Sequence, residues 1–189
     1  MHIVRSRGLA RPAKLNLGSG DVRKPGFLNV DAWPGADVTL DLRRPLPFDS
    51  GCCDLIFTEH CLEHFGYPDE VSGLLSECVR VLRPGGQMLL SVPDSEGPLT
   101  DYANGDDAPY FRMCREHPEW HPGCTTRAEH IDFHYRQGGE HKFGYDFETM
   151  VKLLTRVGLA DVRRRDYDPD LDAALRQGGS LFVAARKPV

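Results

Sequence analysis

Four short groups of glycines and polar residues follow short apolar runs along the first third of the chain. The groups are Gly18-Ser19-Gly20, Asp31, Asp41 and Thr58-Glu59-His60. Glycines let the backbone approach a ligand closely, and carboxylates accept hydrogen bonds from ribose hydroxyls or an exocyclic amine. Each group taken alone is typical of a turn or a solvated surface. Their order along the chain favours a single cleft shaped for a nucleoside.

The apolar runs predict strands that alternate with helices. Strands are predicted over residues 13–17, 27–31, 36–42, 54–58, 87–92, 162–167 and 181–185, and helices over 59–65, 68–82 and 146–157. This alternation predicts an α/β fold with a Rossmann-like, mainly parallel sheet of about seven strands and an antiparallel edge strand. Ligands of such sheets bind at the carboxyl ends of the strands, where the four groups fall.

Length and composition predict one globular domain. The chain has 189 residues and a formal net charge of −5, which disfavours a broad nucleic-acid-binding face. Residues 1–12 are interpreted as a polar lead-in and residues 95–140 as an irregular insertion, because they are poor in aliphatic residues. No secretory signal or membrane span is expected, so the six cysteines are expected to be free thiols in the cytoplasm. The pattern does not predict an oligomeric state.

The order and spacing of these motifs resemble the class I S-adenosylmethionine-dependent methyltransferases, close to the small type 11 group. The matching segments are residues 15–20, 29–31, 41–42, 46–48, 54–65 and 80–86. Two of them are the most specific: Leu62-Glu63-His64-Phe65, and Arg80-Val81-Leu82-Arg83-Pro84-Gly85-Gly86.

The resemblance implies methyl transfer from S-adenosylmethionine to a small-molecule acceptor, such as a sugar or a natural-product metabolite. It implies that the glycines face the methionine part of the cofactor, that Asp31 holds the ribose, and that Asp41 lies at the adenine. The residues implied to bind the cofactor are Asn16, Leu17, Gly18, Ser19, Gly20, Asp31, Ala32, Asp41, Leu42, Thr58, Glu59 and His60.

The sequence also departs from the family pattern. Only ten residues separate Gly20 from Asp31, which is too few for a full crossover helix. The first helices are therefore expected to be shortened or absent. The same segment disfavours a nicotinamide-dependent oxidoreductase, because the third glycine of GxGxxG is missing after Gly20. A non-catalytic, methyltransferase-like binding module remains an alternative.

Two histidines are the candidate catalytic bases, since imidazole accepts protons near neutral pH. His60 follows the strand over 54–58, and His141 lies where the insertion rejoins the core. Weaker candidates are His130, His134 and Tyr135. The insertion is predicted to cap the substrate through Tyr102, Tyr110, Phe111, Trp120, Arg127 and Phe133.

Two zinc sites are weighed against these interpretations. His60, Glu63 and His64 spell the inverted zinc-peptidase motif, which would make the chain a zinc-dependent hydrolase with Glu129 or Glu140 as a third ligand. In the insertion, the candidate ligands are Cys114, His117, His121 and Cys124. The spacer between His117 and His121 is much shorter than in ordinary zinc fingers. The expectation from sequence is that no metal is bound.

Overall fold

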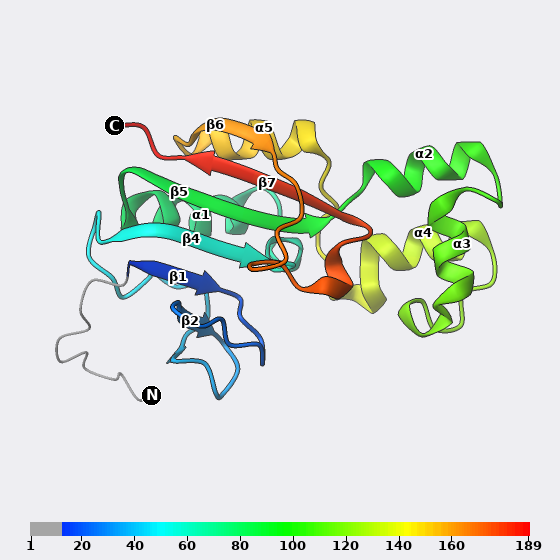
Figure 1. Ribbon diagram of the computed structural model, residues 1–189, viewed down its shortest axis with the longest axis horizontal. Helices are drawn as coiled ribbons and strands as arrows, with labels where there is room; N and C mark the ends of the chain where they lie inside the picture. Colours follow the sequence, from blue (N-terminus) through cyan, green and yellow to red (C-terminus); the bar gives the residue numbers. More distant parts are fainter. Residues whose placement is uncertain (1–12) are drawn as a thin grey trace.

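The computed structural model describes residues 13–189, so the lead-in over residues 1–12 lies outside the described residues. These residues form a seven-stranded sheet in the order β3-β2-β1-β4-β5-β7-β6 (Figure 1). The strands are β1 (Lys14–Leu17), β2 (Leu28–Asp31), β3 (Val38–Thr39), β4 (Cys53–Glu59), β5 (Leu82–Pro93), β6 (Ala160–Arg164) and β7 (Ser180–Arg186). The first five strands pair in parallel, and β7 runs antiparallel to β5 and β6. The predicted fold class is confirmed, with the antiparallel strand second from the edge.

Two helices, α1 (Asp69–Val81) and α5 (Phe147–Arg156), lie on one face of the sheet (Figure 1). Their apolar side chains and those of the strands form the main core. The expected N-cap of α5 is confirmed, since the Asp146 carboxylate accepts a hydrogen bond of 2.8 Å from the Thr149 amide. Gly158, with φ of +97°, follows the helix as its predicted stop.

Residues 18–52 contain β2, β3 and turns, but no helix. The predicted loss of the first helices is therefore confirmed. A helix that follows β1 in an open α/β sheet ordinarily covers the sheet and fixes the loop after the strand. In this protein, other contacts must cover the sheet and fix the loop after β1.

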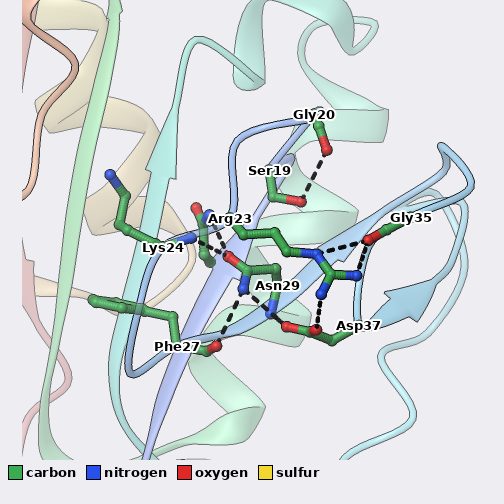
Figure 2. Close-up of polar contacts among 9 residues, drawn as sticks. Ser19, Gly20, Arg23, Lys24, Phe27, Asn29, Gly35 and Asp37 are labelled. Atoms are coloured by element: carbon green, nitrogen blue, oxygen red, sulfur yellow. Dashed lines mark hydrogen bonds and ion pairs between the residues drawn. The ribbon is translucent and has the colours of Figure 1, made fainter.

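The side chain of Asn29 holds the shortened segment together, and Figure 2 shows its contacts. Its Oδ1 accepts hydrogen bonds of 2.9 Å from Asn16 Nδ2 and from the Lys24 amide. Its Nδ2 donates to the Phe27 carbonyl at 3.2 Å and to Asp37 Oδ2 at 2.8 Å. The buried amide thereby uses both donor hydrogens and both acceptor lone pairs.

Loops cover the second face of the sheet near the missing helices. The ammonium of Lys24 lies 4.3 Å from the ring centroid of the buried Phe57. The connection from β6 to β7 also packs here, because the Ala173 amide donates to Glu59 Oε1 at 3.0 Å. This connection is fixed internally by the buried ion pair of Arg165 and Asp172, at 2.6 Å.

The insertion is helical, so the interpretation of residues 95–140 as irregular is wrong. It contains α2 (Glu96–Asn104), α3 (Pro109–Glu116) and α4 (Arg127–Arg136), and the short 3-10 helices η2 (Pro118–Trp120) and η3 (Gln137–Gly139). The helices project beyond one end of the sheet (Figure 1). They bury only a small separate core, which is why their sequence lacks the long apolar stripe of α1.

Two further elements are shorter than expected. The helix predicted over 59–65 is only the 3-10 helix η1 (Leu62–His64), because His60 takes a left-handed φ of 46°. The strand predicted over 36–42 shrinks to β3, and before it the Asp37 carboxylate accepts the Asn29 amide at 2.9 Å. Within residues 13–189, no helix combines the length and apolarity needed to cross a membrane.

We predict that Asn29→Leu destabilises the protein by about 2–4 kcal/mol, because several buried polar groups lose their partner at once. Urea unfolding followed by circular dichroism measures this change. The control is Arg23→Ala, since Arg23 contacts Asp37 at 3.5 Å with a largely exposed side chain and such a pair contributes about 0–1 kcal/mol. Equal losses in the two variants would contradict the role of Asn29.

Candidate functional site

The glycine loop after β1 turns tightly against the segment after β4. Gly18 has φ of +70°, and a Cβ at this position would lie 2.4 Å from Cys61 Sγ. Only glycine therefore allows the loop to sit this close. The amide of Gly18 donates to the Val30 carbonyl at 2.9 Å, which places the loop beside the end of β2.

The Asp31 carboxylate lies at the centre of this corner. Its Oδ2 accepts a hydrogen bond of 2.8 Å from the Gly20 amide, and its Oδ1 accepts one of 2.9 Å from the Trp33 amide. The side chain is partly exposed. Since a carboxylate offers about four lone-pair positions, two remain for a ligand. The structure thus brings Gly20 and Asp31 together, as the sequence predicts.

The other predicted cofactor residues differ in accessibility. The Leu40 amide donates to the Asp31 carbonyl at 2.8 Å, which brings the neighbouring Asp41 to the same corner with an exposed side chain. Ser19 and Ala32 flank the loop and Asp31. Five of the predicted side chains are buried or already hydrogen-bonded within the protein: those of Asn16, Leu17, Leu42, Thr58 and Glu59. Contacts of these five with a ligand stay predictions.

A cavity of about 510 Å³ lies between the end of the sheet and the insertion. His60, Glu63 and Gly179 contribute from the core, and Trp120 and His134 from the insertion. The complete lining is His60, Glu63, His64, Pro93, Tyr110, Met113, Glu119, Trp120, His121, Phe133, His134, Gln137, Glu140, His141, Leu175, Arg176, Gly178 and Gly179. The glycine loop and Asp31 do not line it. His60 of this lining directly follows Glu59, one of the predicted cofactor residues.

The predicted base His60 lies at the floor of the cavity. Its Nε2 is 2.7 Å from Ser180 Oγ, and its Nδ1 is 3.6 Å from Glu63 Oε1. Burial lowers the pKa of His60 to about 2, so the imidazole is neutral at physiological pH. Because His60 is not helical, the face shared by His60 and His64 in the inverted zinc-peptidase motif does not form.

Glu63 is a buried acid without a hydrogen-bond partner for either carboxyl oxygen. Its side chain is 1% exposed, and burial raises its pKa to about 8. At neutral pH it is therefore mostly protonated. The sequence suggested Glu63 only as part of a metal motif, and nothing in the local pattern indicated a neutral acid.

The segment after the insertion brings the second predicted base to the same place. The Lys142 amide donates to the Glu63 carbonyl at 2.7 Å, and the ring centroids of His64 and His141 lie 5.1 Å apart. His141 Nδ1 is 3.2 Å from the His134 carbonyl, to which it can donate only as the Nδ1–H tautomer. That tautomer leaves Nε2 of His141 with a free lone pair.

Four imidazoles of the cavity lining, those of His60, His121, His134 and His141, have lowered pKa values and are neutral at pH 7. Burial lowers the pKa of His121 and of His141 to about 4 each, and it also lowers the pKa of His134. Arg176 is a cation of the lining, and it comes from the 3-10 helix η4 (Ala174–Arg176) between β6 and β7. Sequence reasoning missed Arg176, because only the folded connection carries it to the cavity.

Two groups of side chains within residues 13–189 have the composition and spacing of metal ligands. Glu63, His64 and His141 form one group, and Cys114, His121 and His130 form the other. Within each group the ligand-type atoms lie within 4.8 Å of one another. The second group differs from the set considered from sequence, since it contains His130 in place of His117.

The predicted cap residues divide into two sets. Tyr110, Trp120 and Phe133 line the cavity as expected. Tyr102, Phe111 and Arg127 do not: Arg127 lies 4.9 Å from the Tyr102 ring centroid, and Phe111 is buried in the small core of the insertion. His130 and Tyr135 also lie outside the lining, so neither is favoured as a base.

Comparison with known proteins identifies the class to which this architecture corresponds. Residues 27–90 match the family model described as "Methyltransferase domain". A SAM-dependent methyltransferase from Thermotoga maritima has a similar structure, with a TM-score of 0.54, 13% identity, and coverage of 93% of this chain and 82% of that chain. Phosphoethanolamine N-methyltransferase 2 of Haemonchus contortus, in complex with S-adenosyl-L-methionine, gives a TM-score of 0.55, 14% identity, and coverage of 93% and 48%.

A curated relative matches a shorter segment. An uncharacterized 37.1 kDa protein in transposon TN4556 of Streptomyces fradiae is 35% identical over 69 residues, which are 36% of this chain and 19% of that protein. The chain thus matches a small part of this relative's length. The family match over residues 27–90 and the fold both agree with the resemblance to class I S-adenosylmethionine-dependent methyltransferases.

We predict that Glu63 makes stability fall as pH rises from about 4.5 to 8. In this window the folded state holds a proton that the unfolded state releases, so the loss approaches about 1.4 kcal/mol per pH unit. Glu63→Gln should remove this slope and become the more stable variant at pH 7.5. Urea unfolding between pH 5 and 7.5, with a chelator present, measures it.

The control is the exposed Glu148→Gln, which should keep the wild-type slope. A Glu63→Gln curve parallel to that of the wild type would show that Glu63 is ionised in the folded protein.

Proposed function

We propose that this chain binds S-adenosylmethionine at the corner of Gly18, Gly20 and Asp31 and transfers its methyl group to a hydroxyl of a small polar molecule. The observation that carries the proposal is the cavity with neutral imidazoles, whose lining residue His60 directly precedes Cys61, the residue against which Gly18 packs. The fold and the family match support the cofactor class. The bound cofactor supplies an electrophilic methyl group on a sulfonium ion.

The residues at the corner fit such a cofactor. Asp31 has lone pairs left for two ribose hydroxyls after it accepts the Gly20 and Trp33 amides. Gly20 has φ of +55° and open space where a side chain would stand, so the backbone can lie against a ligand. Asp41 is exposed at the same corner and can accept from the adenine amine.

The cavity fits a small acceptor. Its volume of about 510 Å³ lies within the range of small-molecule sites. Tyr110, Trp120 and Phe133 contribute aromatic rings to the lining, which suits a sugar or a phenol. Arg176 supplies a positive charge that stabilises an acceptor oxygen as its negative charge develops.

His141 is the proposed base. The acceptor oxygen forms a bond to the methyl carbon, the carbon–sulfur bond breaks with its electron pair left on sulfur, and the hydroxyl proton passes to Nε2 of His141. The imidazole is neutral above about pH 4, so its lone pair is available at physiological pH. His60 is less suited, because Ser180 already occupies its Nε2.

A non-catalytic binding module is the second candidate. It would bind the cofactor and transfer no methyl group. The histidine-lined cavity favours the enzyme, because a module needs no base beside the cofactor. The two candidates therefore differ in turnover and agree in cofactor binding.

We predict that the chain binds S-adenosylmethionine and that Asp31→Ala weakens binding about 10- to 100-fold, which corresponds to the loss of a charge-assisted hydrogen bond. Isothermal titration calorimetry with S-adenosylmethionine, and with NAD as a negative control, measures both. Asp21→Ala is the matched control, since its exposed carboxylate lies in the same loop. Unchanged affinity in Asp31→Ala would refute the assignment of Asp31.

We predict that His141→Ala lowers kcat about 10²- to 10⁴-fold and changes cofactor affinity only a few-fold, because a base acts in the transition state. Transfer of radiolabelled methyl to a panel comprising a catechol, a simple phenol, a hexose and an imidazole first identifies an acceptor. The wild-type kcat should then be constant from pH 5.5 to 7, since His141 titrates below that range and Glu63 above it.

His117→Ala is the control for this variant, because its side chain is half-exposed and lies outside the cavity lining. Cofactor binding without transfer to any acceptor would favour the binding module. Full activity in His141→Ala would remove the base assignment and leave the cofactor site intact.

A further inference from the structure

Three side chains of the insertion converge away from the proposed cofactor corner. Cys114 Sγ lies 3.7 Å from His121 Nδ1, and His121 Nδ1 lies 3.1 Å from His130 Nδ1. Cys114 comes from α3, His130 from α4, and His121 from the loop between these helices. Cys114 and His130 are buried, and His121 is half-buried.

Hydrogen bonds alone do not satisfy this cluster. The Nδ1 atom of His121 faces both Cys114 Sγ and His130 Nδ1. A ring nitrogen offers either one N–H or one in-plane lone pair, so His121 Nδ1 can bond only one of these two groups well, while the Cys114 thiol has a further hydrogen bond with Tyr110. A cation at the centre of the three atoms would accept all three lone pairs.

Two of the three separations agree with a tetrahedral zinc ion, and the third lies within 4.8 Å. Zinc lies about 2.3 Å from a thiolate sulfur and about 2.0–2.1 Å from an imidazole nitrogen. Tetrahedral angles then place two nitrogen ligands about 3.3 Å apart, and a sulfur and a nitrogen about 3.6 Å apart. The observed separations of 3.1 Å and 3.7 Å are close to both values.

The insertion also lacks the means to hold itself together by packing. Its separate core consists of four buried residues, Ala108, Tyr110, Phe111 and Cys114. Small units with so little core are commonly stabilised by a metal or a disulfide, and both cysteines of the insertion, Cys114 and Cys124, are free thiols. The three converging side chains tie α3, the loop and α4 together where this core ends.

We propose that Cys114, His121 and His130 bind one structural zinc ion that holds the insertion in its folded form. A thiolate with two imidazoles suits zinc better than magnesium or calcium, which prefer oxygen ligands. Binding releases the proton of the Cys114 thiol. This replaces the expectation of no metal, which rested on the short spacer between His117 and His121.

His117 is not a ligand, since it stacks on Trp120 with ring centroids 4.3 Å apart. Cys124 is the candidate for the fourth position. It follows His121 by three residues and is half-buried. Its Sγ lies 3.5 Å from the Glu129 carbonyl, so it must turn from that contact to reach the ion.

The test is elemental analysis of the full chain purified from zinc-supplemented cells without chelator. The expected result is one zinc ion per chain, which Cys114→Ser and His121→Gln each remove. Cobalt substituted for the zinc should give a sulfur-to-cobalt charge-transfer band in the wild type and, at high cobalt, in His121→Gln, but not in the double variant Cys114→Ser/Cys124→Ser, which has no thiolate ligand. The controls are His117→Ala, which keeps the metal, and Cys124→Ser, which loses affinity if Cys124 is the fourth ligand.

Limited proteolysis supplies a readout that does not depend on measuring the zinc content of the chain. Removal of zinc by a chelator should raise the rate of cleavage within residues 96–140 at least 10-fold, with the sheet left intact. His64→Ala separates this site from the group of Glu63, His64 and His141. Zinc lost in His64→Ala but retained in Cys114→Ser would overturn the proposal, as would a folded wild type without zinc. None of these results depends on methyl transfer.

Discussion

The corner of Gly18, Gly20 and Asp31 depends on the side-chain amide of Asn29, whose hydrogen-bonding groups are all paired. Ten residues between Gly20 and Asp31 leave no room for a helix, so the glycine loop lacks its usual support. Asn29 ties β1, the loop and the approach to β3 through four hydrogen bonds. A buried amide left partly unpaired is costly. This network therefore fixes one position of the loop, and with it the position of the Asp31 carboxylate.

At the Asn29 end of the site, burial determines the position of the glycine loop. At the cavity end, burial determines the charge of the side chains. Glu63 has no partner for its carboxyl oxygens, so burial raises its pKa to about 8. The same environment lowers the pKa of His141 to about 4. An acid kept protonated and a base kept neutral can coexist at pH 7 without opposite charges. In the proposed methyl transfer, the neutral imidazole of His141 is thereby able to accept the hydroxyl proton.

The sequence predicts the parts of the fold that rest on local signals. The stripe of α1, the Asp146 cap and the order of strands with Asp31 at a strand end all follow from spacing and residue type. The helices of the insertion were missed, because their small core leaves a weak apolar pattern. Arg176 and His130 were missed as contributors for another reason: contacts between distant segments bring them to their clusters, and no local pattern records such contacts.

The site has one part on the sheet and one part on the insertion, and these two parts differ in how freely their residues can be substituted. The family match covers residues 27–90 and so ends before α2, whereas Tyr110, Trp120 and Phe133 of the cavity lie in the insertion. The insertion has its own core, separate from that of the sheet. Substitutions there can alter the shape and chemistry of the cavity without disturbing Asn29 or Asp31. Under the proposed function, the insertion carries acceptor specificity, which can diverge while the strands and loops of the shared fold stay the same.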